Sequence, residues 1–565
     1  MSDLAAWRVA ADAWISADPD PETAATLRQQ LDAGDDAALR AAFEHPLTFG
    51  TAGLRGEEGP GPARMNRLVV RRTTWALATH LLATCSDAAE RGVVIGCDAR
   101  SGSSAFAEEA AAVAAGLGLV VHELPRAFPT PLCPFAVAQL GAVAGIQITA
   151  SHNPAKDNGY KVYAADGAQI IAPDDAAVAS LAARAPALVE LAPAQSPLRR
   201  PVDGALVDAY RRTALGLLSP GSPRALRIVY TPLHGVGGAL VPDLLRRAGF
   251  GPVHVVEEQL HPDPAFPTVA FPNPEEPGAL DLALRLAEQV EADLVVANDP
   301  DADRLALCVR DAQGNYVQLS GDQVGWLLAD ATSRRLRRDG SRGMFATTIV
   351  SSSMLEALCA ARHLDFAETL TGFKWIARAG LRSGQPLAFG YEEALGYAVS
   401  PLVADKDGMT AALVACELAA AAASQGTSLL ATIDALESAL GVHSTSSFSL
   451  RFDGPEGPEA MAALLADLLT EPPTELGGSA VLAFENLAQG YRGLPPTTGL
   501  RLELEGPTRV IIRPSGTEPK VKVYLEAVTE PPEHGELLAK RVEAAARLAE
   551  TEMALRARLR PADER

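Results

Sequence analysis

The chain has 565 residues, of which 48% are hydrophobic and 21% charged, and its formal net charge is −21. This length exceeds what one hydrophobic core normally reaches, so we expect several globular domains. The sequence lacks a run of about 18 apolar residues that could span a membrane, and it lacks the basic stripe that nucleic acid or an anionic membrane surface requires.

Two further features of the sequence indicate the cellular compartment. The first 20 residues carry acids, in place of the basic and apolar regions of a signal peptide. Six cysteines lie far apart and form no CxxC pair, which argues against a zinc site and against a disulfide framework. We therefore expect a protein of the reducing cytoplasm.

Three segments repeat the order of a short apolar strand, a small or polar loop, and a helix rich in Ala or Leu. The strand and the helix are predicted at residues 93–98 and 105–116 in the first segment, at 227–230 and 239–248 in the second, and at 344–350 and 354–362 in the third. Strands that alternate with helices in this way are typical of α/β proteins with partly parallel sheets. The spacing of about 110–135 residues predicts three related α/β domains.

The C-terminal part follows a different pattern, which predicts a small α+β domain. Its strands are predicted at residues 447–452, 500–505, 509–513 and 521–528, and its helices at 458–469 and from His534 onward. A proline-rich segment at 185–201 and the change of pattern near 441–449 mark boundaries. The predicted domains are 1–205 with an N-terminal helical extension, 206–318, 319–440 and 441–565.

Three acidic residues follow the apolar strand predicted at 293–297. Asp299, Asp301 and Asp303 alternate along an extended segment, so their carboxylates point to one side and require a cation. Ligation by oxygen alone suits Mg²⁺, which leaves room for a substrate phosphate oxygen. A calcium EF-hand is excluded because Arg304 stands where that loop needs glycine. A solvated acidic turn is the alternative.

Ser151 lies in the loop that follows the strand predicted at 143–148, and open α/β sheets bind ligands at such ends. No GxSxG elbow surrounds it, so an α/β-hydrolase is excluded. His152 is predicted to orient the loop or to contact phosphate. A plain turn is the alternative for this pair alone. Beside the Asp-rich loop, Ser151 becomes a nucleophile next to a metal, which is an arrangement for phosphoryl transfer.

A third motif combines cations, hydroxyls and a glycine that permits close backbone approach, and these groups form a phosphate cradle by their chemistry. Its residues are Arg513, Ser515, Gly516, Thr517 and Lys522. The chain contains no Gly-Lys pair, which excludes a P-loop NTPase. A turn between two strands is the alternative.

A fourth motif places Glu392 and Glu393 among apolar residues after a predicted strand at 386–389. Two neighbouring carboxylates can accept hydrogen bonds from sugar hydroxyls. A solvated pair at the start of a helix is the alternative.

These four motifs, in this order, resemble those of the α-D-phosphohexomutase family, which includes phosphoglucomutases and phosphomannomutases. The resemblance extends from residues 49–56 to Lys522. It implies an α/β protein of three related domains with mixed sheets and a smaller C-terminal α+β domain, with the active site in a central cleft. Residues 371–375 and 405–408 are similar to the phosphoglucomutase branch that also contains phosphopentomutases.

The resemblance also implies a role for each candidate residue. Ser151 would carry the phosphoryl group, and Mg²⁺ would be held by a phosphoserine oxygen together with Asp299, Asp301 and Asp303. The transfer site would be lined by Arg55, His152, Lys161 and Arg304, with Lys161 a candidate acid/base. Substrate would be bound by Lys374, Glu392, Glu393, Lys406, Arg513, Ser515, Gly516, Thr517 and Lys522, the last five holding the phosphate that is not transferred.

The expected reaction is the interconversion of glucose 1-phosphate and glucose 6-phosphate through a phosphoserine and a glucose 1,6-bisphosphate intermediate. Many members of the family carry Ser where this chain has Ala394, which leaves mannose phosphate or pentose phosphate as alternative substrates. A non-catalytic phosphosugar sensor and a metal-dependent phosphatase are less favoured alternatives. We expect a sugar phosphate as the partner, with neither nucleic acid nor membrane, and monomer and dimer both stay open.

Overall fold

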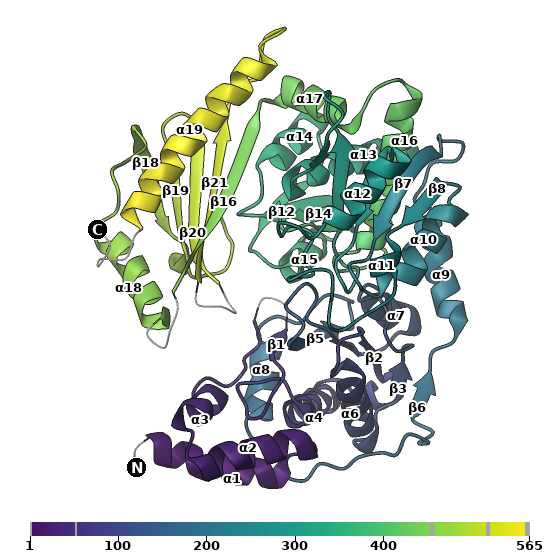
Figure 1. Ribbon diagram of the computed structural model, residues 1–565, viewed down its shortest axis with the longest axis vertical. Helices are drawn as coiled ribbons and strands as arrows, with labels where there is room; N and C mark the ends of the chain where they lie inside the picture. The colour runs from purple at the N-terminus through teal and green to yellow at the C-terminus, as the bar shows by residue number, and fades with distance from the viewer. Residues whose placement is uncertain (1–2, 51–52, 453–456, 516–519, 560–565) are drawn as a thin grey trace. The chain divides into compact units, whose positions relative to one another are not determined.

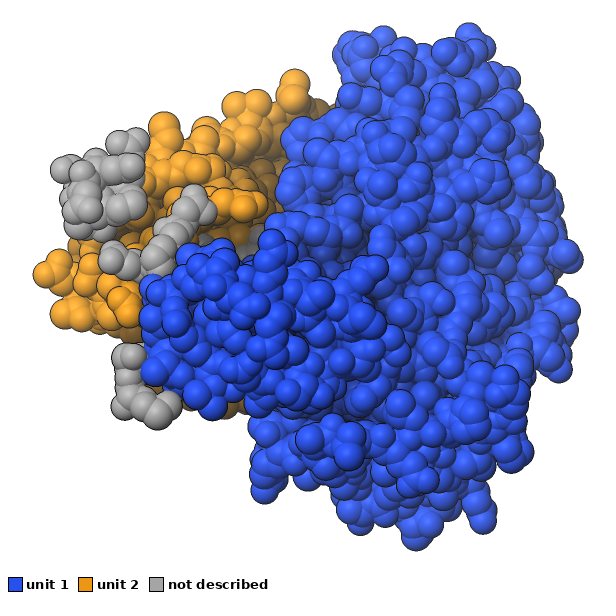
Figure 2. Space-filling view, turned by 60° about the horizontal axis from the view of Figure 1, so that its bottom comes forward, with its two compact units in different colours: residues 1–319, 394–424 blue, residues 320–393, 425–565 orange. Residues whose placement is uncertain are grey.

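The computed structural model describes residues 3–50, 53–452, 457–515 and 520–559. The chain forms two compact units, which Figure 2 shows in blue and orange. The first comprises residues 1–319 and 394–424, and the second comprises residues 320–393 and 425–565. Figure 1 gives the labels of the helices and strands.

The first unit opens with three helices, α1 (Asp3–Ala17), α2 (Pro21–Ala33) and α3 (Asp36–Phe43). Asp20 and Asp35 cap α2 and α3, each accepting a backbone N–H of the first turn. Trp14 and Leu27 are buried in the same core as α4 (Arg67–Thr84), so these helices belong to the body of the unit.

A six-stranded mixed sheet follows, in the order β1-β5-β4-β2-β3-β6. Strands β2, β3, β4 and β6 run parallel, and β5 runs antiparallel to both β1 and β4. Every residue of β2 and of β4 is buried, as expected for strands covered on both faces. The strands are β1 (Leu54–Glu57), β2 (Val93–Cys97), β3 (Val121–Glu123), β4 (Ala144–Ile148), β5 (Asp157–Ala164) and β6 (Arg199–Pro201), and the helices are α5 (Ala88–Arg91), α6 (Ser103–Gly116), α7 (Leu132–Leu140) and α8 (Asp174–Ala182).

The second sheet of this unit has five strands in the order β11-β10-β9-β7-β8. Strand β7 is parallel to β8 and β9, and β10 is antiparallel to β9, so this sheet is also mixed. Its strands are β7 (Ala225–Thr231), β8 (Gly251–Val255), β9 (Leu294–Ala297), β10 (Ala306–Arg310) and β11 (Tyr316–Gln318). The accompanying elements are α9 (Gly204–Leu215), α10 (Gly237–Arg247), α11 (Glu257–Leu260), α12 (Asp281–Val290), β15 (Gly396–Ala398) and α16 (Gly408–Ser424).

In the second unit β12 is flanked by β13 and β14, both parallel to it. Helix α13 begins with a capping box between Ser320 and Gln323 and ends at Gly340, whose φ of 62° suits glycine. The elements of this part are α13 (Gly321–Asp339), β12 (Met344–Thr348), α14 (Met354–Arg362), β13 (Phe366–Thr369), α15 (Phe373–Ser383), β14 (Leu387–Glu392) and α17 (Leu429–Leu440).

The rest of the second unit is an antiparallel sheet in the order β16-β21-β20-β19-β18-β17, with α19 (Leu537–Arg558) lying along it in Figure 1. Its apolar face, including Val523 and Leu525, forms a core with Leu548 and Leu555 of α19. The other elements are β16 (His443–Arg451), α18 (Gly457–Thr470), β17 (Glu475–Leu476), β18 (Ser479–Asn486), a short 3-10 helix (Leu487–Gln489), β19 (Leu500–Leu504), β20 (Thr508–Pro514) and β21 (Lys520–Val528).

A buried ionic cluster within the second unit, which we call the Glu526 cluster, joins the loop after β12 to the antiparallel sheet. Glu526 on β21 accepts hydrogen bonds from Arg509 Nη2, Ser352 Oγ and the backbone N–H of Ser353, each at 2.8 Å. His443 Nδ1 lies 3.1 Å from the same carboxylate. Arg509 also donates to the carbonyl of Ser351 at 2.6 Å. The cluster therefore fixes the loop of residues 351–353 to the C-terminal sheet.

The predicted fold class is confirmed: three α/β sheets are followed by a C-terminal sheet with helices. Strand β18 was not predicted, because its residues alternate between exposed and half-buried and Leu482 is 69% exposed, which gives a weak hydrophobic pattern. The central cleft stays a prediction. No single helix in the described ranges is long and apolar enough to cross a membrane; α16 and α17 reach that length only as a bent pair.

Candidate active site

Ser151 lies in the loop between β4 and β5, at the C-terminal end of a buried strand. Its φ is +50°, a left-handed conformation that is uncommon for a residue with a side chain. Its backbone N–H donates to Thr149 Oγ1 at 2.9 Å. Its hydroxyl donates to Asp299 Oδ2 at 2.6 Å and lies 3.2 Å from His152 Nδ1. The loop thus presents the Ser151 hydroxyl to the acidic loop of the neighbouring sheet.

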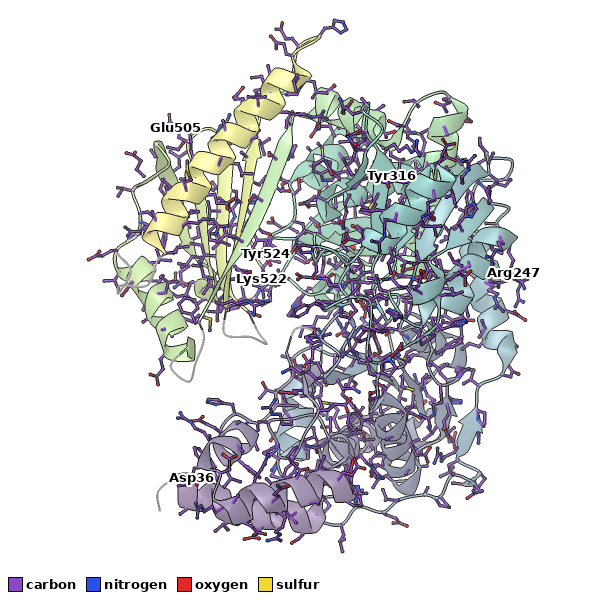
Figure 3. All side chains as sticks on the ribbon, viewed as in Figure 1. Asp36, Arg247, Tyr316, Glu505, Lys522 and Tyr524 are labelled. Atoms are coloured by element: carbon purple, nitrogen blue, oxygen red, sulfur yellow. The ribbon has the colours of Figure 1, made fainter. Side chains whose placement is uncertain are left out.

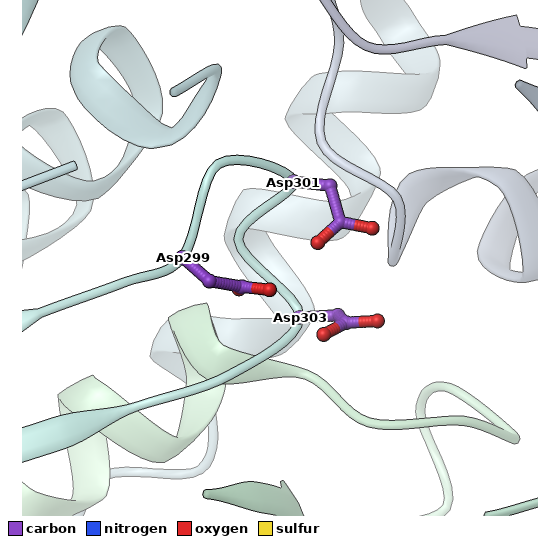
Figure 4. A group of neighbouring side chains, drawn as sticks. All are labelled: Asp299, Asp301 and Asp303. Carbon is purple, nitrogen blue, oxygen red and sulfur yellow. The ribbon is translucent and has the colours of Figure 1, made fainter. Parts of the chain in front are cut away.

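Asp299, Asp301 and Asp303 lie in the loop between β9 and β10, and their carboxylates converge (Figure 4). All three side chains are buried, and one oxygen of each lies within 4.8 Å of the others. The turn that allows this includes Ala302, whose φ is +60°. Three carboxylates this close require positive charge.

The carboxylates fit a divalent cation. Within the described part of the chain, Asp301 Oδ1 and Asp303 Oδ1 are buried and have no hydrogen-bond partner. The other oxygen of each carboxylate accepts a hydrogen bond from Lys161 Nζ, at 3.0 and 2.9 Å. One oxygen of each is therefore held by the protein and one is left for a ligand. Hard oxygen donors of this kind suit Mg²⁺.

The surroundings shift several pKa values strongly. Burial, together with Asp301 and Asp303, raises the pKa of Asp299 well above its ordinary value. Burial opposes the ionised form of Asp301 as well, but Lys161 and the hydrogen bonds that Asp301 receives together outweigh burial and lower the pKa of Asp301. Burial and the nearby Arg304 hold the pKa of His152 well below its ordinary value, which keeps this imidazole neutral.

Further cations surround the carboxylates. Lys406 Nζ lies 3.3 Å from Asp303 Oδ2. Arg304 Nε lies 3.9 Å from Asp299 Oδ2 and 4.0 Å from Asp303 Oδ1. Arg55 Nη1 donates to the side chain of Asn153 in the Ser151 loop at 2.8 Å. The candidate residues of the first unit thus lie together. Arg55 reaches the others through Asn153 of the Ser151 loop, and the rest are linked by direct contacts.

The remaining candidates lie in the second unit. Glu392, at the end of β14, accepts the backbone N–H of Gly372 at 2.8 Å, and Lys374 lies two residues beyond that glycine at the start of α15. Glu393 Oε2 accepts a hydrogen bond from Ser351 Oγ at 2.9 Å. The predicted sugar-binding loop is therefore held by its neighbours, including the loop that the Glu526 cluster fixes.

The predicted phosphate cradle lies at the end of the hairpin where β20 leads into β21. Arg513 and Lys522 stand directly opposite each other across the two strands, and Lys522 is labelled in Figure 3. Ser515 N–H donates to the carbonyl of Lys520 at 2.8 Å. Like charges placed opposite each other are destabilising, so this position favours an anion. Gly516 and Thr517 lie outside the described residues.

Two residues of the site were not predicted. Thr130 Oγ1 and Thr149 Oγ1 donate to Asp301 Oδ2 at 2.8 and 3.2 Å. Thr149 is part of the segment that identified Ser151, so its position in sequence was a signal. Thr130 is separated from Asp301 by 171 positions, and nothing in the local sequence points to it.

Models of the four domains of the phosphoglucomutase/phosphomannomutase family match the chain. Alpha/beta/alpha domains I, II and III match residues 46–187, 210–314 and 320–437, and the C-terminal domain matches residues 453–545.

Three relatives agree with this match. A protein of Haemophilus influenzae named "Probable phosphomannomutase" is 39% identical over 468 residues, which cover 82% of this chain and 93% of the relative. Human phosphopentomutase is 34% identical and covers 92% of this chain and 91% of its own length. A phosphoglucomutase of Staphylococcus epidermidis is 34% identical and covers 85% of this chain and 90% of its own length.

The fold and the matched domains define a mutase, an isomerase that transfers a phosphoryl group within its substrate. The chain belongs to the phosphoglucomutase/phosphomannomutase family, the α-D-phosphohexomutases.

Proposed function

We propose that this enzyme is a phosphoglucomutase that interconverts glucose 1-phosphate and glucose 6-phosphate through a phosphoserine at Ser151 and a glucose 1,6-bisphosphate intermediate. One observation carries the proposal. The hydroxyl of Ser151 lies 2.6 Å from Asp299 Oδ2, within a buried set of three carboxylates that fits a cation. A nucleophile and a metal site in contact are what phosphoryl transfer requires.

The chain's residues divide the work of transfer. The bond between phosphorus and Ser151 Oγ breaks as a sugar hydroxyl bonds to phosphorus, and the proton that the sugar hydroxyl loses is balanced by the one that Ser151 Oγ gains. The second half-reaction reverses these changes at the other end of the sugar. Bound Mg²⁺, held by Asp299, Asp301 and Asp303, would neutralise charge on the transferring phosphoryl group. Lys161, 1% exposed, is a fixed cation beside it. Its role as the acid/base stays a prediction.

The second unit supplies recognition in this proposal. Glu392, Glu393 and Lys374 would hold the sugar, and Lys406 would contact substrate from the first unit. Arg513, Ser515 and Lys522 would hold the phosphate that is not transferred, together with Gly516 and Thr517. The two positive charges of Arg513 and Lys522, which stand opposite each other across the strands, support this assignment.

A pentose phosphate or a mannose phosphate is the second candidate substrate. The relatives named phosphopentomutase and probable phosphomannomutase cover 92% and 82% of the chain, against 85% for the phosphoglucomutase of Staphylococcus epidermidis. Ala394, in place of the serine that many members carry, removes one hydroxyl from the sugar loop. A phosphosugar sensor is less favoured, because binding alone would not need Ser151 beside the carboxylates.

The test is a side-by-side assay with glucose 1-phosphate, mannose 1-phosphate and ribose 1-phosphate, each with Mg²⁺ and its own bisphosphate. We expect the highest kcat/KM for glucose 1-phosphate, and none for any substrate after Ser151→Ala. A higher kcat/KM for ribose or mannose 1-phosphate would replace glucose in the proposal. Full activity of Ser151→Ala would overturn the phosphoserine.

The domain boundaries after residues 205, 318 and 440 are also part of the proposal. They are supported because each matched family domain lies within one of the four predicted domains. A cytoplasmic location is also proposed. It is supported by six free cysteines, five of them buried.

A further inference from the structure

The guanidinium of Arg100 is bound to the backbone of the Ser151 loop. Arg100 follows β2 and is 3% exposed. Its Nη2 donates to the carbonyls of Ser151 and Asn153, at 2.7 and 2.6 Å. Its Nη1 donates to the carbonyls of Pro154 and Asp157, at 2.6 and 2.9 Å. Four carbonyls of one loop therefore converge on a single side chain.

Arg100 is itself fixed in place. Asp98 accepts the backbone N–H of Arg100 at 3.0 Å, and its carboxylate lies 3.4 Å from Arg100 Nε. Ser103 Oγ donates to the same carboxylate at 2.5 Å. The ring of Phe266 covers the guanidinium, with its centroid 5.2 Å away. Asp98 and Phe266, neither of which belongs to the Ser151 loop, thus hold Arg100 in place while its two terminal nitrogens donate to the loop.

The loop needs such a support because its conformation is not the one its residues prefer. A φ of +50° at Ser151 is disfavoured for a residue with a Cβ atom. The carbonyl of Ser151 lies in the interior, where an unpaired carbonyl is costly. Arg100 satisfies that carbonyl. Asn153 is held by the same guanidinium and accepts a hydrogen bond from Arg55 Nη1. The position of Arg55 therefore depends on Arg100 as well.

We propose that Arg100 is a positioning residue that fixes the Ser151 hydroxyl in line with the carboxylates, and that Asp98 orients it. The proposal rests on the proposed function of Ser151. Arg100 is 3% exposed, and the four hydrogen bonds of its guanidinium go to backbone carbonyls, so it acts through the loop. Lysine cannot replace it, because an ammonium has three donors and lacks the planar fork that reaches four carbonyls.

The test compares Arg100→Lys with Arg199→Lys. Arg199, on β6 of the sheet that contains β2, is also buried, and its four side-chain hydrogen bonds go to Glu108 and Glu123 and not to the Ser151 loop. A displacement of the reacting atom by about 1 Å can cost about 100-fold in rate. We expect Arg100→Lys to lower kcat by about 100-fold, with KM for glucose 1-phosphate changed by less than about threefold, while Arg199→Lys keeps its kcat.

Single-turnover transfer from the phosphorylated enzyme to glucose 1-phosphate, below the melting temperature of both variants, should show the same loss for Arg100→Lys. Equal losses of kcat in the two variants, or a normal kcat in Arg100→Lys, would overturn the proposal. If Arg100→Lys does not fold, Asp98→Asn is measured in its place, with a kcat loss of at least about tenfold expected and a normal kcat overturning the proposal. A wild-type enzyme without mutase activity on any sugar phosphate would instead refute the proposed function.

Discussion

Replacing Lys161 with methionine removes a buried cation that bridges Asp301 and Asp303 of the Asp triplet. Its ammonium donates to Asp301 Oδ2 at 3.0 Å and to Asp303 Oδ2 at 2.9 Å, and its side chain is 1% exposed. Methionine has a similar length and no charge, so the change takes the bridging ammonium away from two buried carboxylates, although Asp303 keeps Lys406 at 3.3 Å.

The size of the effect follows from these contacts. Removing one member of a buried ion pair costs about 3–5 kcal/mol. Two hydrogen bonds to charged groups, at about 1.5–3 kcal/mol each, give a similar sum. For a domain of about 150–250 residues, a loss of about 3–5 kcal/mol lowers the melting temperature by about 6–20 °C.

The assay is thermal unfolding with EDTA and with excess Mg²⁺. We expect the full loss for Lys161→Met in EDTA and less than half of it in Mg²⁺, because the ion replaces the missing positive charge beside Asp301 and Asp303. Lys156→Met is the matched control. Its ammonium pairs with Glu57 at 3.2 Å on the surface, with a side chain 64% exposed, so it should change the melting temperature by about 1 °C or less. An equal loss for Lys161→Met with and without Mg²⁺ would refute the reasoning.

Three further outcomes are expected. Asp301→Asn should lower kcat by about 100-fold and raise the Mg²⁺ concentration needed for half-maximal activity, with the fold retained because the change lies in a loop; activity that persists in excess chelator would contradict this. Arg513→Ala should raise KM for glucose 1-phosphate by about tenfold or more and increase the dependence on added glucose 1,6-bisphosphate, since contacts to charged groups are worth about 1.5–3 kcal/mol; a lower melting temperature with an unchanged KM would remove Arg513 from the cradle. For Glu526, burial acts to raise the pKa, but Arg509 and His443 outweigh it and lower the pKa to about 2. The stabilisation is therefore fully present above the ordinary pKa of about 4.3 and is lost as pH falls through 2, so Glu526→Gln should cost about 3 kcal/mol at pH 7 and about half of that at pH 3; a pH-independent cost would contradict this.

The candidate residues that the sequence revealed are those whose chemistry lies in one short segment. Asp299, Asp301 and Asp303 alternate along five positions, and Ser151 follows a strand directly, so strand periodicity places both sets at strand ends. Lys161 was identified only through the resemblance to a family, because its two carboxylate partners are 140 and 142 positions away.

Arg100 and Thr130 could not be identified in this way. Each acts through contacts with residues at least 51 positions away, and an isolated Arg or Thr in a loop has no distinctive neighbours. In the fold, strands with strong apolar runs such as β2 and β4 were predictable, whereas the half-exposed strand β18 was not. The side-chain contacts of Arg100 and Thr130 and the strand pairing of β18 are all long-range, and the local sequence pattern does not encode them.

The Glu526 cluster has a consequence for how substrate preference can change. Arg509 and Ser352 tie the C-terminal sheet to the loop of residues 351–353, and Ser351 of that loop donates to Glu393. The candidate residues for sugar hydroxyls and the strands that carry Arg513 and Lys522 are thus parts of one connected framework. We expect a substitution at Glu526, which is 3% exposed, to shift the loop of Glu393 through Ser351. With Glu392 and Glu393 as the proposed sugar ligands, sugar preference is therefore expected to respond to mutation at a buried position outside their loop.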